Sequence, residues 1–176
     1  MNSMARACSM VVNLLFPRGC AGCDKPDEVL CEACRALFSQ PTAQSFDGVA
    51  MQRWFACGWY RGTVRKAVLA WKDHGDEECD RAFADAICAL AKASGVIDFV
   101  RDRHGSCHDV VVVPAPSSPA SIRRRGRKHM MPIAKHLAGF LREETGCEVT
   151  VRDALENRGS KGNQCRPAVR RNGRNV

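Results

Sequence analysis

The fold is decided by residues 108–151, which read HDVVVVPAPSSPASIRRRGRKHMMPIAKHLAGFLREETGCEVTV. Four consecutive valines, Val110–Val113, lie between turn-forming residues, which is typical of a strand buried on both faces of a parallel sheet. Apolar residues at helical spacing predict a helix over 132–145, closed by Gly146. The alternating residues 147–151 predict a second strand. Strand, helix and strand in this order predict a βαβ unit and an α/β fold class.

Further elements are predicted upstream of this unit. The aromatic-rich residues 54–60 predict a strand. Apolar residues at helical spacing between residues 64 and 71 predict a helix that ends at residues 72–75, and a second helix is predicted over 78–94. Residues 39–50 are polar and rich in turn formers, which predicts a linker. The tryptophans are predicted to lie in the core rather than to form a surface on which bases stack.

Four of the eleven cysteines are spaced as metal ligands. Cys20, Cys23, Cys31 and Cys34 form two C-x-x-C pairs separated by seven residues. Each pair lets two thiolates reach one metal from a tight turn, so the two pairs supply a closed tetrahedral site for a structural Zn²⁺. The competing interpretations are a redox dithiol and a pair of disulfides. The doubled motif favours zinc, because a redox site needs a single pair that opens a long helix.

The hydropathy of the chain indicates where in the cell the protein is expected. The apolar stretch 10–16 is short and no small-residue cleavage site follows it, so no secretory signal is predicted. No apolar run is long enough to cross a bilayer, so no membrane insertion is expected. We therefore expect a reducing, cytoplasmic location, where paired cysteines bind metal more often than they form disulfides.

Positive charge is concentrated in the second part of the chain. The net charge of the whole chain is +8, but residues 121–176 alone hold 14 basic and 5 acidic side chains, a net charge of +9. No acid follows Glu156. This asymmetry indicates an anionic partner, either nucleic acid or a phosphate-bearing ligand. The alternative is a solvated basic tail without a partner.

The loop after the valine strand carries side chains that can hold phosphate. It follows the carboxyl end of a predicted parallel strand, and open α/β sheets bind ligands at that edge. Serine hydroxyls can donate to phosphate oxygens, and arginines match them in a bidentate way. The alternative is a solvated loop, and a lysine at a helix end also complements the helix dipole. The candidate phosphate-binding residues are Ser117, Ser118, Arg123, Arg124, Arg125 and, at the end of the upstream helix, Lys72.

Taken together, these segments resemble one known family. The ComF family has, in the same order, segments like LLFPRGCAGC (14–23), LCEAC (30–34), WYRGTVRKAVLAWKDHG (59–75) and VVVPAPSSPASIRRRGRKHMMPIAKHLA (111–138). The resemblance implies a four-cysteine zinc ribbon over 1–38, the linker over 39–50, and a type I phosphoribosyltransferase-like parallel sheet with flanking helices over 51–176. It also implies phosphoribosyl pyrophosphate as a ligand, and a role in competence, DNA uptake or DNA use beside a competence-machinery protein.

One difference from the family bears on activity. The acidic Asp-Asp…Thr-Thr-Gly loop, with which the family holds the ribose phosphate, is not among the 176 residues. We therefore expect an incomplete phosphoribosyltransferase-like domain and leave transferase activity open. The alternative function is that of a non-enzymatic zinc-ribbon protein whose basic C-terminal half binds nucleic acid or a protein partner.

Overall fold

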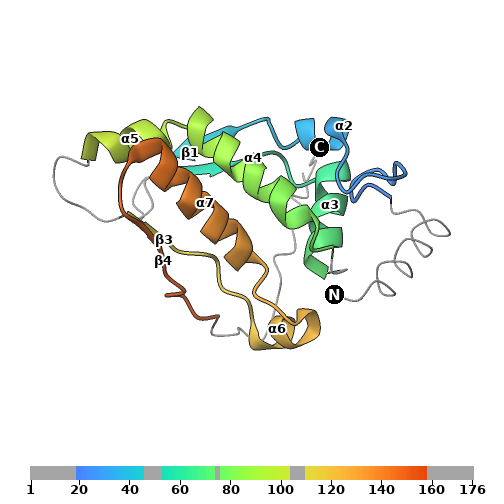
Figure 1. Ribbon diagram of the computed structural model, residues 1–176. Coiled ribbons are helices and arrows are strands. Elements are labelled where there is room, and N and C mark those ends of the chain that lie inside the picture. The colour runs from blue at the N-terminus through green and yellow to red at the C-terminus, as the bar shows by residue number, and fades with distance from the viewer. Residues whose placement is uncertain (1–18, 46–52, 74–75, 104–109, 158–176) are drawn as a thin grey trace, which may run out of the picture.

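The computed structural model describes residues 19–45, 53–73, 76–103 and 110–157. In chain order the elements are α2 (Glu32–Ala36), β1 (Thr42–Ser45), β2 (Arg53–Ala56), α3 (Gly62–Asp73), α4 (Cys79–Ala93), α5 (Val96–Arg103), β3 (Val110–Val112), α6 (Pro119–Arg125), α7 (Met130–Thr145) and β4 (Val149–Val151). Figure 1 shows α4 and α7 side by side across the middle of the molecule. Helix α5 lies at one end of this pair, and α2 and α3 lie at the other.

The predicted βαβ unit is present. Strands β3 and β4 pair in parallel, with Val110 opposite Val149 and Val112 opposite Val151. Helix α7 lies between them in the chain and is followed by Gly146, close to the predicted bounds. Two short two-stranded sheets, one of them parallel, combine with the helices into a mixed α/β architecture.

The valine strand is shorter and more exposed than predicted. Strand β3 covers only Val110–Val112, because Pro114 and Pro116 have no N–H with which to pair; residues 108–109 lie outside the described chain. Val111 and Val113 are 47% and 42% exposed, so the prediction of burial on both faces is wrong. The physical reason is that α5 and α7 pack on one face of this sheet, and the described residues provide no second layer of helices.

The two upstream helices form close to their predicted bounds. Both are amphipathic, and Ala67 and Trp71 of α3 are buried against Phe83 of α4. Helix α4 ends next to its predicted end at residue 94, but a further helix, α5, begins directly after Gly95. Helix α5 was not predicted, because eight residues are too few to show a helical period.

Residues 42–45 correct the predicted linker. They form β1, which pairs antiparallel with β2, Thr42 lying opposite Ala56 and Ser45 opposite Arg53. The sequence TAQS is only weakly strand-forming, so the backbone pairing with β2 selects the strand. Residues 46–50 of the predicted linker lie outside the described chain. Strand β2 is shorter than the strand predicted over 54–60.

Helix α6 replaces part of the predicted basic loop. Its first turn is capped by Ser118, whose side chain accepts from the Ser121 N–H, and Pro119 occupies the first helical position. Gly126 ends the helix with φ 74°, a left-handed conformation that favours glycine. Local capping signals thus specify a helix where the charge pattern had indicated a loop.

The cysteine module shares its core with α3 and α4. One buried cluster joins Cys20, Leu30, Cys31, Cys34 and Phe38 to Val64, Ala67, Trp71, Cys79 and Phe83. The rings of Phe38 and Trp71 each lie 5.1 Å from the ring of Phe83. Trp71 is therefore a core residue, as predicted, whereas Trp59 is 62% exposed, against the prediction.

Within the residues that the structure describes, no helix has both the length and the apolar character needed to cross a bilayer.

Candidate functional site

The four cysteines of the two C-x-x-C pairs converge on one point. The sulfur atoms of Cys20, Cys23, Cys31 and Cys34 all lie within 4.8 Å of one another. The Cys23 and Cys31 sulfurs are 3.6 Å apart. A tetrahedral site with metal–sulfur bonds of about 2.3 Å has edges of about 3.8 Å between sulfurs. The four cysteines are therefore positioned to bind one metal ion, as the spacing predicts.

The first pair is held in a tight turn. The Asp24 N–H donates to the Cys20 carbonyl and the Cys20 N–H donates to the Lys25 carbonyl, both at 2.8 Å. A side chain at Gly22 would not fit, because a Cβ there would lie 2.8 Å from Thr63 Cγ2 and 2.9 Å from Cys34 Sγ. Gly22 thus lets the turn approach both the second cysteine pair and α3.

The second pair is placed by α2. Cys31 is the N-cap residue of this helix, and Cys34 lies one turn further on, so both sulfurs point to the same side. The Cys31 N–H donates to Cys20 Sγ at 3.3 Å, which links the two pairs. Cys20, Cys31 and Cys34 are buried and Cys23 is exposed.

The electrostatics of the cluster favour one thiolate. Burial disfavours the Cys20 thiolate, but the N–H groups of Cys31, Gly22 and Cys23 outweigh it and lower the pKa of Cys20 to about 6. Burial raises the pKa of Cys34 far above its usual range, and hydrogen bonds with neighbouring cysteine side chains raise it further. A bound cation would supply the charge that the remaining thiolates need.

A second cluster forms where the end of α3 meets α6. Arg124 Nη2 lies 3.0 Å and Arg125 Nη2 lies 3.4 Å from Asp73 Oδ1. Lys72 precedes Asp73 in α3, and its charge contributes to lowering the pKa of the nearby His129. The structure therefore brings together three of the predicted phosphate-binding residues, Lys72, Arg124 and Arg125, from segments about 50 positions apart.

His129 connects this arginine cluster to Ser117. Arg125 Nη1 lies 2.9 Å and Ser117 Oγ lies 3.2 Å from His129 Nδ1. Burial lowers the pKa of His129, and the charges of Arg125, Lys72 and Arg127 lower it further. The imidazole is thus held neutral with Nδ1 as acceptor, since the guanidinium can only donate. His129 is not among the site residues predicted from the sequence, so this role was missed.

Ser118 and Arg123 take no part in the cluster. The Ser118 hydroxyl accepts from the Ser121 N–H at 3.2 Å and donates to Ser121 Oγ at 2.9 Å, so it caps α6. Arg123 is exposed on the same helix. Of the predicted residues of this segment, only Ser117, Arg124 and Arg125 are thus connected to one another through His129 and Asp73.

Two acidic side chains that were not singled out from the sequence pair with Arg127 and Lys128, the two basic residues that follow α6. Arg127 Nη1 and Nη2 lie 2.5 and 3.0 Å from the Asp80 carboxylate. Trp71 Nε1 also donates to Asp80, at 2.6 Å. Lys128 pairs with Asp153, just beyond β4. These acids could not be found from sequence, because they lie 25 or more positions away from the bases they meet.

A cavity of about 300 Å³ opens at the carboxyl ends of β3 and β4. Ser117 and Lys128 line it together with Asp153 and Glu156. This is the edge at which open α/β sheets bind ligands. Ser117 faces both this cavity and His129, so the cavity and the arginine cluster adjoin.

Comparisons with the models of known protein families, with curated proteins and with solved structures found no match for this chain.

Proposed function

We propose that this protein is a cytoplasmic ComF-like protein of the phosphoribosyltransferase type, with a structural zinc and a site for a phosphate-bearing ligand. The single observation that carries the ligand site is the convergence of Arg124 and Arg125 on one carboxylate, that of Asp73, next to Lys72 in the chain. The order of the sequence motifs supports the family, and the four-cysteine cluster supports the metal.

Zinc is the metal that the cysteine cluster fits best. Four thiolates in a closed tetrahedral arrangement are typical of structural Zn²⁺, and such a site leaves no open position for catalysis. The cluster lies in the core shared with α3 and α4, where a structural ion stabilises the fold. The cytoplasmic location follows from the same chemistry, because a reducing compartment keeps the cysteines available as ligands.

The arginine cluster has an excess of positive charge. Two arginine side chains contact the Asp73 carboxylate, and the charge of Lys72 acts on the adjoining His129. Arginine forks match the oxygens of phosphate. The Arg125 side chain is only 8% exposed, and its Nε finds no acceptor among the described residues. A buried donor without an acceptor destabilises the protein, so the cluster favours an additional anion. The resemblance makes phosphoribosyl pyrophosphate the first candidate for that anion.

Calorimetric titration with inorganic pyrophosphate, and then with phosphoribosyl pyrophosphate, tests this proposal. Arg124 is the residue to change, because its side chain is 64% exposed and its loss should not disturb folding. We expect Arg124→Ala to weaken binding about tenfold or more, the usual effect of losing a charge-assisted hydrogen bond. Asp73→Asn should strengthen binding, because it removes the carboxylate that competes for the arginines.

Arg81→Ala is the matched control, because Arg81 is exposed and pairs with Asp85 on α4, away from the cluster. Its affinity for pyrophosphate should equal that of the wild type. Equal affinity of the wild type and Arg124→Ala, or weaker binding by Asp73→Asn, would contradict the proposed site.

A nucleic-acid-binding protein is the second candidate. It is favoured by the six basic residues after Glu156, which no acid accompanies. A single-stranded oligonucleotide in the same titration separates the two functions. Binding to nucleic acid should fall with salt at a log–log slope of roughly 0.7 per phosphate contact and should survive Arg124→Ala. A protein partner from the competence machinery belongs to the same proposal, since the resemblance implies both.

A further inference from the structure

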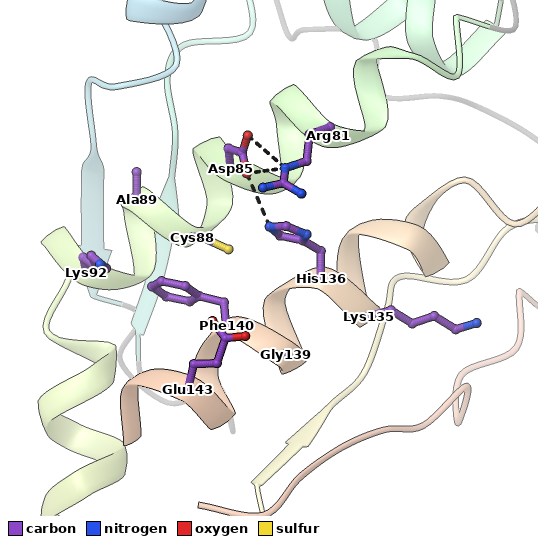
Figure 2. A pocket seen from close by; sticks show the side chains of 10 residues that line it. All are labelled: Arg81, Asp85, Cys88, Ala89, Lys92, Lys135, His136, Gly139, Phe140 and Glu143. Carbon is purple, nitrogen blue, oxygen red and sulfur yellow. Dashed lines mark hydrogen bonds and ion pairs between the residues drawn. The ribbon is translucent and has the colours of Figure 1, made fainter. Parts of the chain in front are cut away.

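Helices α4 and α7 form a groove on their outer face. Figure 2 shows the side chains that line this hollow of about 670 Å³, and all of them come from these two helices. The helices run in the same direction, since Asp85 meets His136 in their second turns and Lys92 meets Glu144 near their last. The distances are 3.3 Å between Asp85 Oδ1 and His136 Nε2, and 2.7 Å between Lys92 Nζ and Glu144 Oε1.

Small residues lie at the middle of the groove. Ala89 on α4 is exposed, and Gly139 occupies the corresponding place on α7. Glycine disfavours a helix interior, so its presence in the third turn of α7 needs a reason. Packing within the described chain gives none: the one described heavy atom within 4 Å of a Cβ built at Gly139 is Arg142 Nη2, at 4.0 Å. The space above Gly139 is open to another molecule.

Charged side chains of opposite sign flank these small residues, and their order along α4 is the reverse of their order along α7. On α7, Lys135 precedes Gly139 by four residues and Glu143 follows it by four, so both lie on the same helix face about 6 Å from it. On α4 the order is reversed, with Asp85 before Ala89 and Lys92 after it. Lys135 and Glu143 make no ion pair with any other residue that the structure describes.

We propose that this surface, the groove face, binds a second copy of the same chain about a two-fold axis that crosses Ala89 and Gly139. Each helix then lies antiparallel to its equivalent. Lys135 of one copy meets Glu143 of the other, and the reverse contact follows by symmetry. Asp85 meets Lys92 in the same way. Because Gly139 of one copy faces Gly139 of the other, the axes of the two α7 helices can approach to the lower end of the distances found between packed helices.

A second copy fits this face better than a partner of one charge. A uniformly acidic or basic segment would place like charges against half of the charged side chains of the groove face. The groove face is, in contrast, complementary to itself after the two-fold rotation. The long stems of the rim lysines and glutamates of each copy can also lie in the hollow of the other, over Phe140 and Cys88.

Sedimentation velocity over a range of concentrations tests the proposal on the full chain. We expect the wild type to self-associate reversibly. Lys135→Glu and Glu143→Lys should each weaken the dimer about tenfold, because two symmetric attractions become repulsions. An equimolar mixture of the two variants should restore the affinity, since each reversed charge then meets its opposite. Lys66→Glu, an exposed charge reversal on α3, is the matched control and should leave the dimer unchanged.

Gly139→Leu supplies a steric test that does not depend on charge. The added side chain projects into open space in the monomer, so unfolding midpoints should not fall, while the dimer should be lost. A wild type that remains monomeric at about 1 mM, the weak limit of specific association, would overturn the proposal. Wild-type affinity in Lys135→Glu, or a mixture without restored affinity, would overturn it as well.

Discussion

His129 holds two predicted phosphate-binding residues in place, and it does so in its neutral form. Arg125 and Ser117 both contact its Nδ1 atom. Its ring lies 5.0 Å from that of Trp71, edge to face, so the contact extends into the core. A protonated Nδ1 would repel the Arg125 guanidinium. It would also donate to the Ser117 hydroxyl instead of accepting a hydrogen bond from it. The residue therefore makes stability depend on pH.

We expect the free energy of unfolding to decrease as pH falls below 6.5. Burial and the neighbouring cations lower the pKa of His129 from its ordinary value of 6.5 in the folded protein. Below pH 6.5 His129 binds a proton in the unfolded chain but not in the folded chain. Unfolding is therefore increasingly favoured until the pH reaches the pKa of His129 in the folded protein. Urea unfolding at several values between about pH 7.5 and 5 should show this slope, and His129→Gln should flatten it. Identical slopes in the two proteins would contradict the contact.

At the scale of elements, α6 shows what a single cap contributes. Ser118 was predicted as a phosphate ligand, and the structure gives its hydroxyl to the first turn of α6. We expect Ser118→Ala to lower the free energy of unfolding by about 1 kcal/mol, the usual effect of losing an N-cap, and to leave pyrophosphate affinity unchanged. Ser118→Asp keeps the cap and should keep the stability. A large loss of affinity in Ser118→Ala with unchanged stability would return Ser118 to the phosphate site.

The elements that could be predicted are those with a full period or a buried apolar run. Helices α3, α4 and α7 extend over three turns or more, so their apolar faces are visible in the sequence. The short elements were missed for different reasons. Strand β1 is selected by its partner β2 rather than by its own residues, and α5 is too short to show a period. The signals for α6, Ser118 before Pro119 and glycine at 126, were present but outweighed by the run of arginines.

At the scale of the whole molecule, the sequence predicted the cysteine cluster and not the charge network. The cysteines are close in sequence, so their spacing alone fixes that they meet. Asp73 and Asp80 meet arginines that follow them by about 50 positions, and only the packing of α3 and α4 against the α6–α7 segment brings them together. The net charge of the basic segment therefore overstates how many of its side chains are available to bind an anion. The net charge of +9 includes Arg124, Arg125, Arg127 and Lys128, each of which is paired.

The cysteine cluster and the helices also form one packing unit. The turn at Gly22 lies against both Cys34 of the cluster and Thr63 at the start of α3. Cys20 and Cys34 belong to the same buried cluster as Trp71 and Phe83. A metal at the cysteines would therefore stabilise the core of α3 and α4 together with its own turns.

The most direct test of the cysteine cluster as a metal site is the zinc content of the protein, measured by elemental analysis after purification without added metal. We expect about one zinc per chain, because four thiolates supply a single tetrahedral site, and close to none in the Cys31→Ser, Cys34→Ser double variant. Ala33→Ser, an exposed change between the two ligands, should retain the zinc and serves as the control. A wild type that contains no zinc, or a double variant that keeps all of it, would contradict a zinc site at these cysteines.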